Sequence, residues 1–185
     1  STSNDTGPKA AVLVQEGGSS GSTQESPAIQ TSYAEIILTG YETTFTEVVG
    51  SDTGANAVAI VNADISIIDL DSTTLYSAVI TVTNLKDGAA ESLLIDGILP
   101  TGIVASAYNA ATGTLTLTGT ASKADYETAL KLVRYNNSSD NPNTTTRTIE
   151  ITVNDGDIDS NTAVTTIALI PVNDAPTTTP VTLTA

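Results

Sequence analysis

This chain of 185 residues contains no cysteine, no histidine, no methionine and no tryptophan. Without cysteine it can form neither a disulfide nor a thiolate metal site. Without histidine or cysteine, the common nucleophile–base triads of hydrolases are excluded. Paired carboxylates can cleave glycosidic bonds, but such sites usually lie in clefts lined with aromatic side chains. Aromatic residues make up only 4% of this chain, so we expect a protein that is not an enzyme.

Basic residues are also scarce. The chain has 6 lysines and arginines against 21 aspartates and glutamates, a formal net charge of -15. Nucleic acids and anionic membrane surfaces both attract basic side chains, so neither is an expected partner. No apolar run approaches the roughly 20 residues of a membrane-spanning helix, which argues against membrane insertion. The charge instead fits a protein that binds divalent cations or that depends on its charge for solubility.

Threonine, valine and isoleucine are abundant, and these β-branched residues favour strands. In one run Ala78, Ile80 and Val82 alternate with other residues, which predicts a strand with these three side chains facing a core. Turn signals such as Asp87-Gly88 and Asp155-Gly156 separate the runs. The strands predicted in this way cover residues 35–38, 43–48, 57–61, 65–68, 77–83, 91–95, 104–109, 114–118, 132–136, 146–153 and 163–171. Many short strands separated by turns indicate an all-β sandwich or barrel.

One segment, residues 122–131, breaks the strand pattern. Ser122 can cap the first turn of a helix there, and Tyr126, Ala129 and Leu130 then fall on one face. The sequence predicts a single short helix that crosses between two strands.

Composition divides the chain into three parts. Residues 1–32 include the flexible stretch GGSSGSTQES and are expected to form an extension or linker with one detached strand, Ala10–Val14. Residues 33–176 form the predicted β domain. Residues 177–185 are expected to be a tail or the first strand of a following domain, with a second detached apolar strand at Val181–Thr184.

Several motifs follow one another in a recognisable order: Thr44–Glu47 (TFTE), Ile68–Ser72 (IDLDS), Val153–Asp157 (VNDGD) and Val172–Pro176 (VNDAP). This ordered set, within residues 43–176, resembles the cadherin-like repeats of large bacterial surface adhesins, including those of the RTX-adhesin type. The resemblance implies an all-β, immunoglobulin-like Greek-key sandwich with one short helical crossover. It also implies an extracellular location, secreted or on the cell surface, with calcium at or near the ends of the domain.

Acidic residues supply the ligands that such a calcium site would need. Calcium takes roughly six to eight oxygen ligands, mainly from carboxylates and carbonyls. Residues at i and i+2 of a strand point to the same side, so paired aspartates at that spacing can meet one ion. The candidate ligands are Glu47, Asp69, Asp71, Asp155, Asp157, Asp159, Asn173 and Asp174. The resemblance suggests that Glu47 lies at the domain entrance and that entrance, exit and aspartate-rich loops gather at one end; the alternative is that Asp-Gly and Asn-Asp pairs simply form turns.

Three functions compete at this point. The first is a calcium-binding extracellular module of a bacterial surface adhesin, acting as a spacer or as a ligand-binding domain beside neighbouring domains of the same kind. The second is a self-assembling extracellular fibre subunit, joined to neighbouring subunits by donated terminal strands. The third is a domain that uses its acidic loops and calcium to bind a carbohydrate or peptide ligand.

Overall fold

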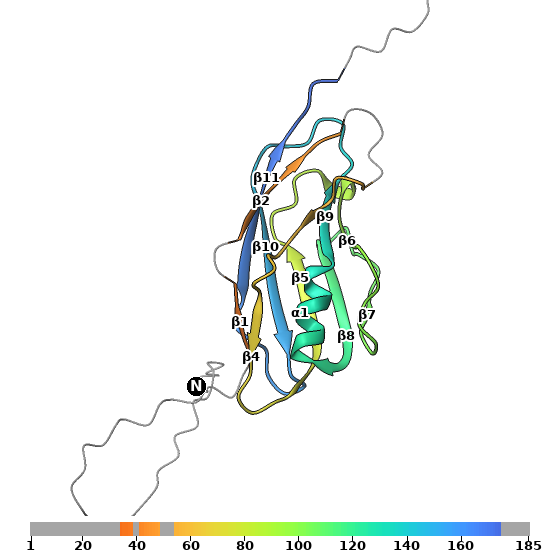
Figure 1. The fold of residues 1–185 in the computed structure, drawn as a ribbon. Coiled ribbons are helices and arrows are strands. Elements are labelled where there is room, and N and C mark those ends of the chain that lie inside the picture. Colours follow the sequence, from red (N-terminus) through yellow and green to blue (C-terminus); the bar gives the residue numbers. More distant parts are fainter. Residues whose placement is uncertain (1–33, 39–40, 49–53, 175–185) are drawn as a thin grey trace, which may run out of the picture.

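The computed structural model describes residues 34–38, 41–48 and 54–174 (Figure 1). The predicted extension at residues 1–32 and tail at 177–185 lie outside these residues, together with both predicted detached strands. The described part is mostly β, with one α-helix, α1 (Lys123–Lys131).

The strands form three sheets. The strands in chain order are β1 (Glu35–Ile37), β2 (Glu42–Thr46), β3 (Val58–Ala59), β4 (Ser66–Ile68), β5 (Thr74–Val82), β6 (Glu91–Ile95), β7 (Val104–Ala105), β8 (Thr114–Ser122), β9 (Val133–Asn137), β10 (Arg147–Asn154) and β11 (Ala163–Ile170). The largest sheet has the order β2-β11-β10-β5-β8-β7, a second has the order β3-β9-β6, and β1 pairs with β4. The β2–β11 pair is parallel, whereas the other named strand pairs are antiparallel.

The core sits where the predicted alternation places it. Ala78, Ile80 and Val82 of β5 are buried, as are Leu115 and Leu117 of the neighbouring β8. The threonines of β8 lie on the other face, as do Val79 and Thr81 of β5, so β8, and β5 from Ala78 onward, alternate with a period of two. The predicted core face is confirmed.

The helix also forms where it was predicted. Ser122 caps α1 in a reciprocal capping box with Asp125, which satisfies two backbone amides of the first turn. Tyr126, Ala129 and Leu130 are buried, and the Tyr126 hydroxyl donates to the carbonyl of Gly119 at 2.6 Å. The helix links β8 to β9 as a crossover. A mostly-β fold with one short helix is therefore confirmed, while the immunoglobulin-like Greek-key sandwich stays a prediction.

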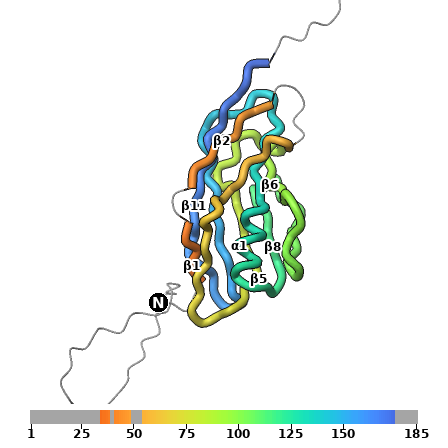
Figure 2. The backbone as a smooth tube through the Cα atoms, in the orientation of Figure 1, coloured from red at the N-terminus to blue at the C-terminus, as the bar shows by residue number. Residues whose placement is uncertain are grey.

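Strand directions decide which loops share an end of the molecule. Because β2 and β11 run parallel, the residues that follow both strands lie at the same end, near the top in Figures 1 and 2. The strand β10 runs antiparallel to β11 and ends at the opposite side, where β4 also ends. Residues 69–73, after β4, and residues 155–162, after β10, therefore lie far from residues 171–174, which follow β11.

Candidate metal sites

One cluster of carboxylates lies where the described chain ends. Oxygen atoms of Glu47, Asp140 and Asp174 lie within 4.8 Å of one another, and we call these three residues the exit triad. Glu47 directly follows β2 and Asp174 follows β11, so the parallel pairing of these strands brings the two together. Asp140 comes from the loop between β9 and β10. Three segments that are distant in sequence therefore build this cluster.

Glu47 is the buried member of the exit triad, with only 6% of its surface exposed. Its Oε2 atom accepts a hydrogen bond from the backbone amide of Val172 at 2.8 Å. Its Oε1 atom is buried without a hydrogen-bond partner, and so is Oδ1 of Asp174. Buried carboxylate oxygens normally find a partner, because leaving one without a donor is unfavourable. These two atoms are in place to meet a cation.

A second cluster lies at the opposite end of the largest sheet. Carboxylate oxygens of Asp69, Asp71 and Asp155 lie within 4.8 Å of one another, and we call them the entrance triad. Asp69 follows Ile68, which pairs with Glu35 in the first described strand, so this is the end at which the described chain begins. The spacing of Asp69 and Asp71 and the position of Asp155 after β10 bring the three carboxylates together.

Asp69 plays the part in the entrance triad that Glu47 plays in the exit triad. It is 7% exposed, and its Oδ1 atom accepts from the backbone amides of Asp71 at 3.2 Å and Ser72 at 3.1 Å. Its Oδ2 atom is buried and has no hydrogen-bond partner. The same turn is held by Lys123, whose Nζ atom donates to the carbonyls of Asp69 at 2.6 Å and Ser72 at 2.9 Å. One oxygen of Asp69 thus fixes the turn while the other stays free.

Neighbouring carboxylates shift the proton affinity of an exposed aspartate in each triad. The pKa of Asp71 is raised because its protonated form can donate a hydrogen bond to Asp69, and also by desolvation and by the charge of Asp69. The pKa of Asp140 is raised because its protonated form can donate a hydrogen bond to Asp174, and also by the charge of Asp174 and by desolvation. Like charges held this close disfavour ionisation, and a bound cation would remove the repulsion.

Three predicted ligands lie outside both groups. Asp157 is exposed, and Asp159 accepts a hydrogen bond from Nδ2 of Asn154 at 2.8 Å. Asn173 is exposed, and its side-chain amide donates to the carbonyl of Asp174 at 3.5 Å. The structure does not bring their side chains into either triad, so their role as ligands stays a prediction.

The expectation of a single cluster at one end is wrong. Glu47 does not lie at the entrance but at the exit, because β2 pairs in parallel with β11 and carries it there. Asp140 was missed altogether. Its sequence signal is only an aspartate before the Asn141-Pro142 turn, and its partners are remote in sequence.

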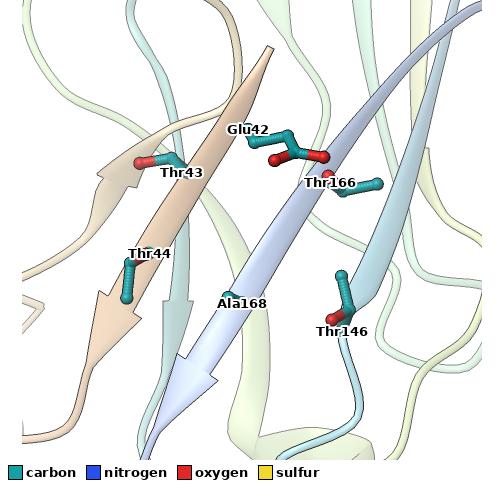
Figure 3. Close-up of a pocket in the computed structure, with 6 residues that line it drawn as sticks. All are labelled: Glu42, Thr43, Thr44, Thr146, Thr166 and Ala168. Atoms are coloured by element: carbon teal, nitrogen blue, oxygen red, sulfur yellow. The ribbon is translucent and has the colours of Figure 1, made fainter. Parts of the chain in front are cut away.

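A shallow depression of about 350 Å³ lies on the largest sheet, away from the triads. The residues that line it are Glu42, Thr43, Thr44, Thr146, Thr166 and Ala168 (Figure 3). Figure 3 shows the carboxylate of Glu42 directed toward Thr166. The depression offers hydroxyl groups and one carboxylate, which is a weaker set of cation ligands than either triad.

A scan against protein-family models finds no match for this chain, and searches of curated proteins and of solved structures find none either. Among the described residues, no helix is both long enough and apolar enough to span a membrane. Within the part of the chain that the structure describes, the two triads are the groups of acidic side chains that could hold a metal ion.

Proposed function

We propose that this chain is a calcium-binding module that holds one cation at each end, in the exit triad and in the entrance triad. The observation that carries the proposal is the same at both ends. A buried carboxylate, from Glu47 or Asp69, uses one oxygen to hold the backbone and leaves the other without a partner. Two further carboxylates converge on each of them. A cation bound among the three carboxylates would reduce their mutual repulsion and give the free oxygen a partner.

The chemistry of the ligands favours calcium over other cations. Both triads offer oxygen atoms alone, whereas zinc and copper prefer sites with imidazole or thiolate ligands. Magnesium demands near-ideal octahedral geometry and usually keeps several waters, so a cluster of three carboxylates suits it less well. Calcium accepts six to eight oxygens in flexible geometry, which leaves positions at each site for carbonyls, waters or oxygens from another domain.

The positions of the triads suggest what the cations do. The two triads lie at opposite ends of the largest sheet. A cation at such a point can bind oxygens from two consecutive domains and so stiffen the joint between them. Together with the resemblance to cadherin-like repeats, this supports a calcium-stiffened spacer or ligand-binding domain of an extracellular bacterial surface adhesin, built on an immunoglobulin-like sandwich.

The alternative of a self-assembling fibre subunit draws on a different feature. Within the described residues β6 pairs with β9 alone, so one of its edges has no strand beside it. An extended segment such as Ala10–Val14 of a neighbouring subunit is a candidate to add there. Filaments that persist in EDTA but disappear when residues 1–16 are deleted would favour this alternative over the spacer.

The decisive experiment compares unfolding with calcium and with EDTA for the wild type and two variants. Glu47→Gln and Asp69→Asn each remove one buried charge but keep an oxygen that can accept the backbone hydrogen bonds. At free calcium about 100 times the dissociation constant, each occupied site adds about 2.7 kcal/mol to the free energy of unfolding. We expect each variant to lose the part of the calcium-dependent gain in unfolding free energy that one site contributes.

Asp157→Asn is the matched control, because it removes one exposed charge from the same loop as Asp155, keeps the backbone amide that donates to Oδ1 of Asp155 at 2.9 Å, and changes a side chain that belongs to neither triad. Its response to calcium should equal that of the wild type. A wild-type melting temperature that is the same in EDTA and in calcium would contradict the proposal. So would a loss in Asp157→Asn as large as that in Asp69→Asn.

A further inference from the structure

The loop that carries Asp140 is fastened to a buried ionic cluster. Arg147, the first residue of β10, is fully buried. Its Nε atom lies 2.8 Å from Oε2 of Glu91, and its Nη2 atom lies 2.7 Å from Oδ2 of Asp87. We call Asp87, Glu91 and Arg147 the clamp. One planar guanidinium thus bridges two carboxylates, a geometry that arginine supports and lysine does not.

The carboxylate of Glu91 in the clamp has hydrogen-bond donors for both of its oxygens. Besides Arg147, the carboxylate of Glu91 accepts from the backbone amides of Lys86 at 2.7 Å and Asp87 at 2.6 Å. It also accepts from the hydroxyl of Tyr135 at 2.9 Å. A buried polar network in which every member has partners is rigid and holds its parts in one arrangement.

Asp87 ties down the loop on both sides of Asp140. Its two carboxylate oxygens accept from the backbone amide of Asn143, each at 3.1 Å. On the other side, Nδ2 of Asn137 donates to Asp87 at 2.7 Å, while Oδ1 of Asn137 accepts from the amide of Ser139 at 3.0 Å. The residue three positions after Asp140 is therefore anchored to Asp87 directly, and the residue before Asp140 is anchored to it through Asn137.

Arg147 also forms hydrogen bonds to the same loop. Its Nη1 atom donates to the carbonyls of Asn143, at 3.2 Å, and of Thr145. The clamp also reaches the strand that leads to Glu47, because the ring of Tyr135 packs edge-on against Phe45 with centroids 5.8 Å apart. Two of the three exit ligands thus depend on residues of the clamp or in contact with it.

We propose that the Asp87–Glu91–Arg147 clamp is the positioning element of the exit site, holding Asp140 where its carboxylate meets Glu47 and Asp174. This inference rests on the proposed binding of a cation at the exit triad. Asp140 is exposed on a connecting loop, so without such anchoring the loop would have to be ordered when the cation binds. Residues that orient metal ligands without touching the metal typically change affinity by about 10 to 100-fold when they are replaced.

The test is a calorimetric calcium titration of Asp87→Asn in two backgrounds. In Asp69→Asn protein only the exit site is left to bind, and in Glu47→Gln protein only the entrance site. We expect Asp87→Asn to weaken calcium binding at the exit site about tenfold or more and to leave the entrance site unchanged. An unchanged entrance site also shows that the variant is folded.

Asp96→Asn is the matched control. It makes the same change of charge and breaks an arginine ion pair as well, but that pair, with Arg134, is exposed and lies at 3.1 Å outside the clamp. It should leave both sites as they are. A tenfold loss in Asp96→Asn equal to that in Asp87→Asn would mean that net charge, and not positioning, sets the affinity, and would overturn the inference.

A double-mutant cycle with Asp140→Asn separates positioning from general loosening of the fold. If Asp87 acts through Asp140, then Asp87→Asn should have almost no further effect on exit-site affinity once Asp140 is replaced. Additive effects would overturn the inference. Should Asp87→Asn fail to fold, Asn137→Ala provides the same test, because it cuts the link to Ser139 and leaves both ion pairs of Arg147 in place.

The outcomes distinguish the two proposals. If the wild type binds no calcium in either background, the proposed function fails. If the wild type binds at the exit site and both Asp87→Asn and Asn137→Ala bind there with unchanged affinity, the positioning role of the clamp fails while the proposed function stands.

Discussion

The two triads have the same arrangement of carboxylates, but different parts of the fold hold them in place. In each, a buried carboxylate accepts from one or two backbone amides through one oxygen and leaves the other free, with an exposed and a half-buried aspartate beside it. Two of the three entrance ligands, Asp69 and Asp71, belong to one turn that Lys123 holds through its carbonyls, and only Asp155 comes from a distant loop. The exit triad is assembled from three distant segments.

The difference lies in what each site requires of the rest of the molecule. A turn closed by short-range hydrogen bonds depends on few residues, so the entrance site should tolerate changes elsewhere in the fold. The exit site depends on the parallel pairing of β2 with β11 and on a loop fixed by the buried clamp. Its geometry should therefore be more exact and more vulnerable to substitution in the core.

The largest effect should come from the centre of the exit support. Replacing Arg147 with methionine leaves Glu91 and Asp87 without their cation, and Glu91 has no exposed surface at all. Breaking a buried pair in this way typically costs about 3–5 kcal/mol. We expect a loss of that size in the free energy of unfolding, measured by urea denaturation in EDTA so that calcium binding does not contribute.

Arg134→Met is the control for that substitution. Its partner Asp96 has a side chain that is 68% exposed, and exposed ion pairs contribute about 0–1 kcal/mol. Equal losses in the two variants would show that burial of the clamp adds nothing to stability.

A smaller effect is expected at the entrance support. In Lys123→Met the carbonyls of Asp69 and Ser72 lose a charged donor, and a hydrogen bond to a charged group contributes about 1.5–3 kcal/mol at most. Since Lys123 is partly exposed, we expect a loss of about 1–2 kcal/mol. Lys131→Met, at the other end of α1, should cost less, about 0.3–1 kcal/mol through the helix dipole.

The comparison is sharpened by measuring calcium affinity in the same Lys123 variant. The exit triad lies at the opposite end of the sheet, so its affinity should not change. A change at the exit site as large as the change at the entrance site would mean that the two supports are not independent.

Patterns in the sequence predicted those features that depend on residues close to one another in the chain. The alternation of Ala78, Ile80 and Val82 predicted the core face, and Ser122 predicted the start of the helix. The sequence also predicted that the carboxylates of Asp69 and Asp71 would meet, but it placed them on a strand, whereas they lie in the turn that follows β4.

The features that depend on contacts between distant segments could not be predicted. No periodicity reveals that β2 pairs in parallel with β11, and that pairing alone moves Glu47 from the expected entrance to the exit. Asp140 reaches its partners only through tertiary structure. Charged residues such as Arg147 and Glu91 are rarely fully buried, so their residue types argued for a surface position and concealed the clamp.

The smallest expected effect is the change in the free energy of unfolding with pH that Glu91 of the clamp contributes. Burial raises the pKa of Glu91, but hydrogen bonds from Arg147 and from the amides of Asp87 and Lys86 more than offset this, so its pKa is lowered overall. A carboxyl group whose pKa is lower in the folded protein contributes stability above its unfolded pKa of about 4.5 and loses it as the pH falls through the folded value. Because burial opposes the hydrogen bonds, the net effect should be modest.

Glu91→Gln isolates this contribution from those of Asp71 and Asp140, whose raised pKa values act in the opposite direction. Both aspartates are present in the wild type and in the variant, so their effects cancel in the difference. We expect the wild type to exceed Glu91→Gln in free energy of unfolding most at neutral pH, with the difference shrinking below about pH 4.5 as Glu91 becomes protonated. Urea denaturation in EDTA between about pH 7 and pH 3 measures it. A difference that does not vary with pH would mean that Glu91 has the same pKa in the folded and the unfolded protein, and the clamp would then not stabilise the charged carboxylate that distinguishes the exit support from the entrance support.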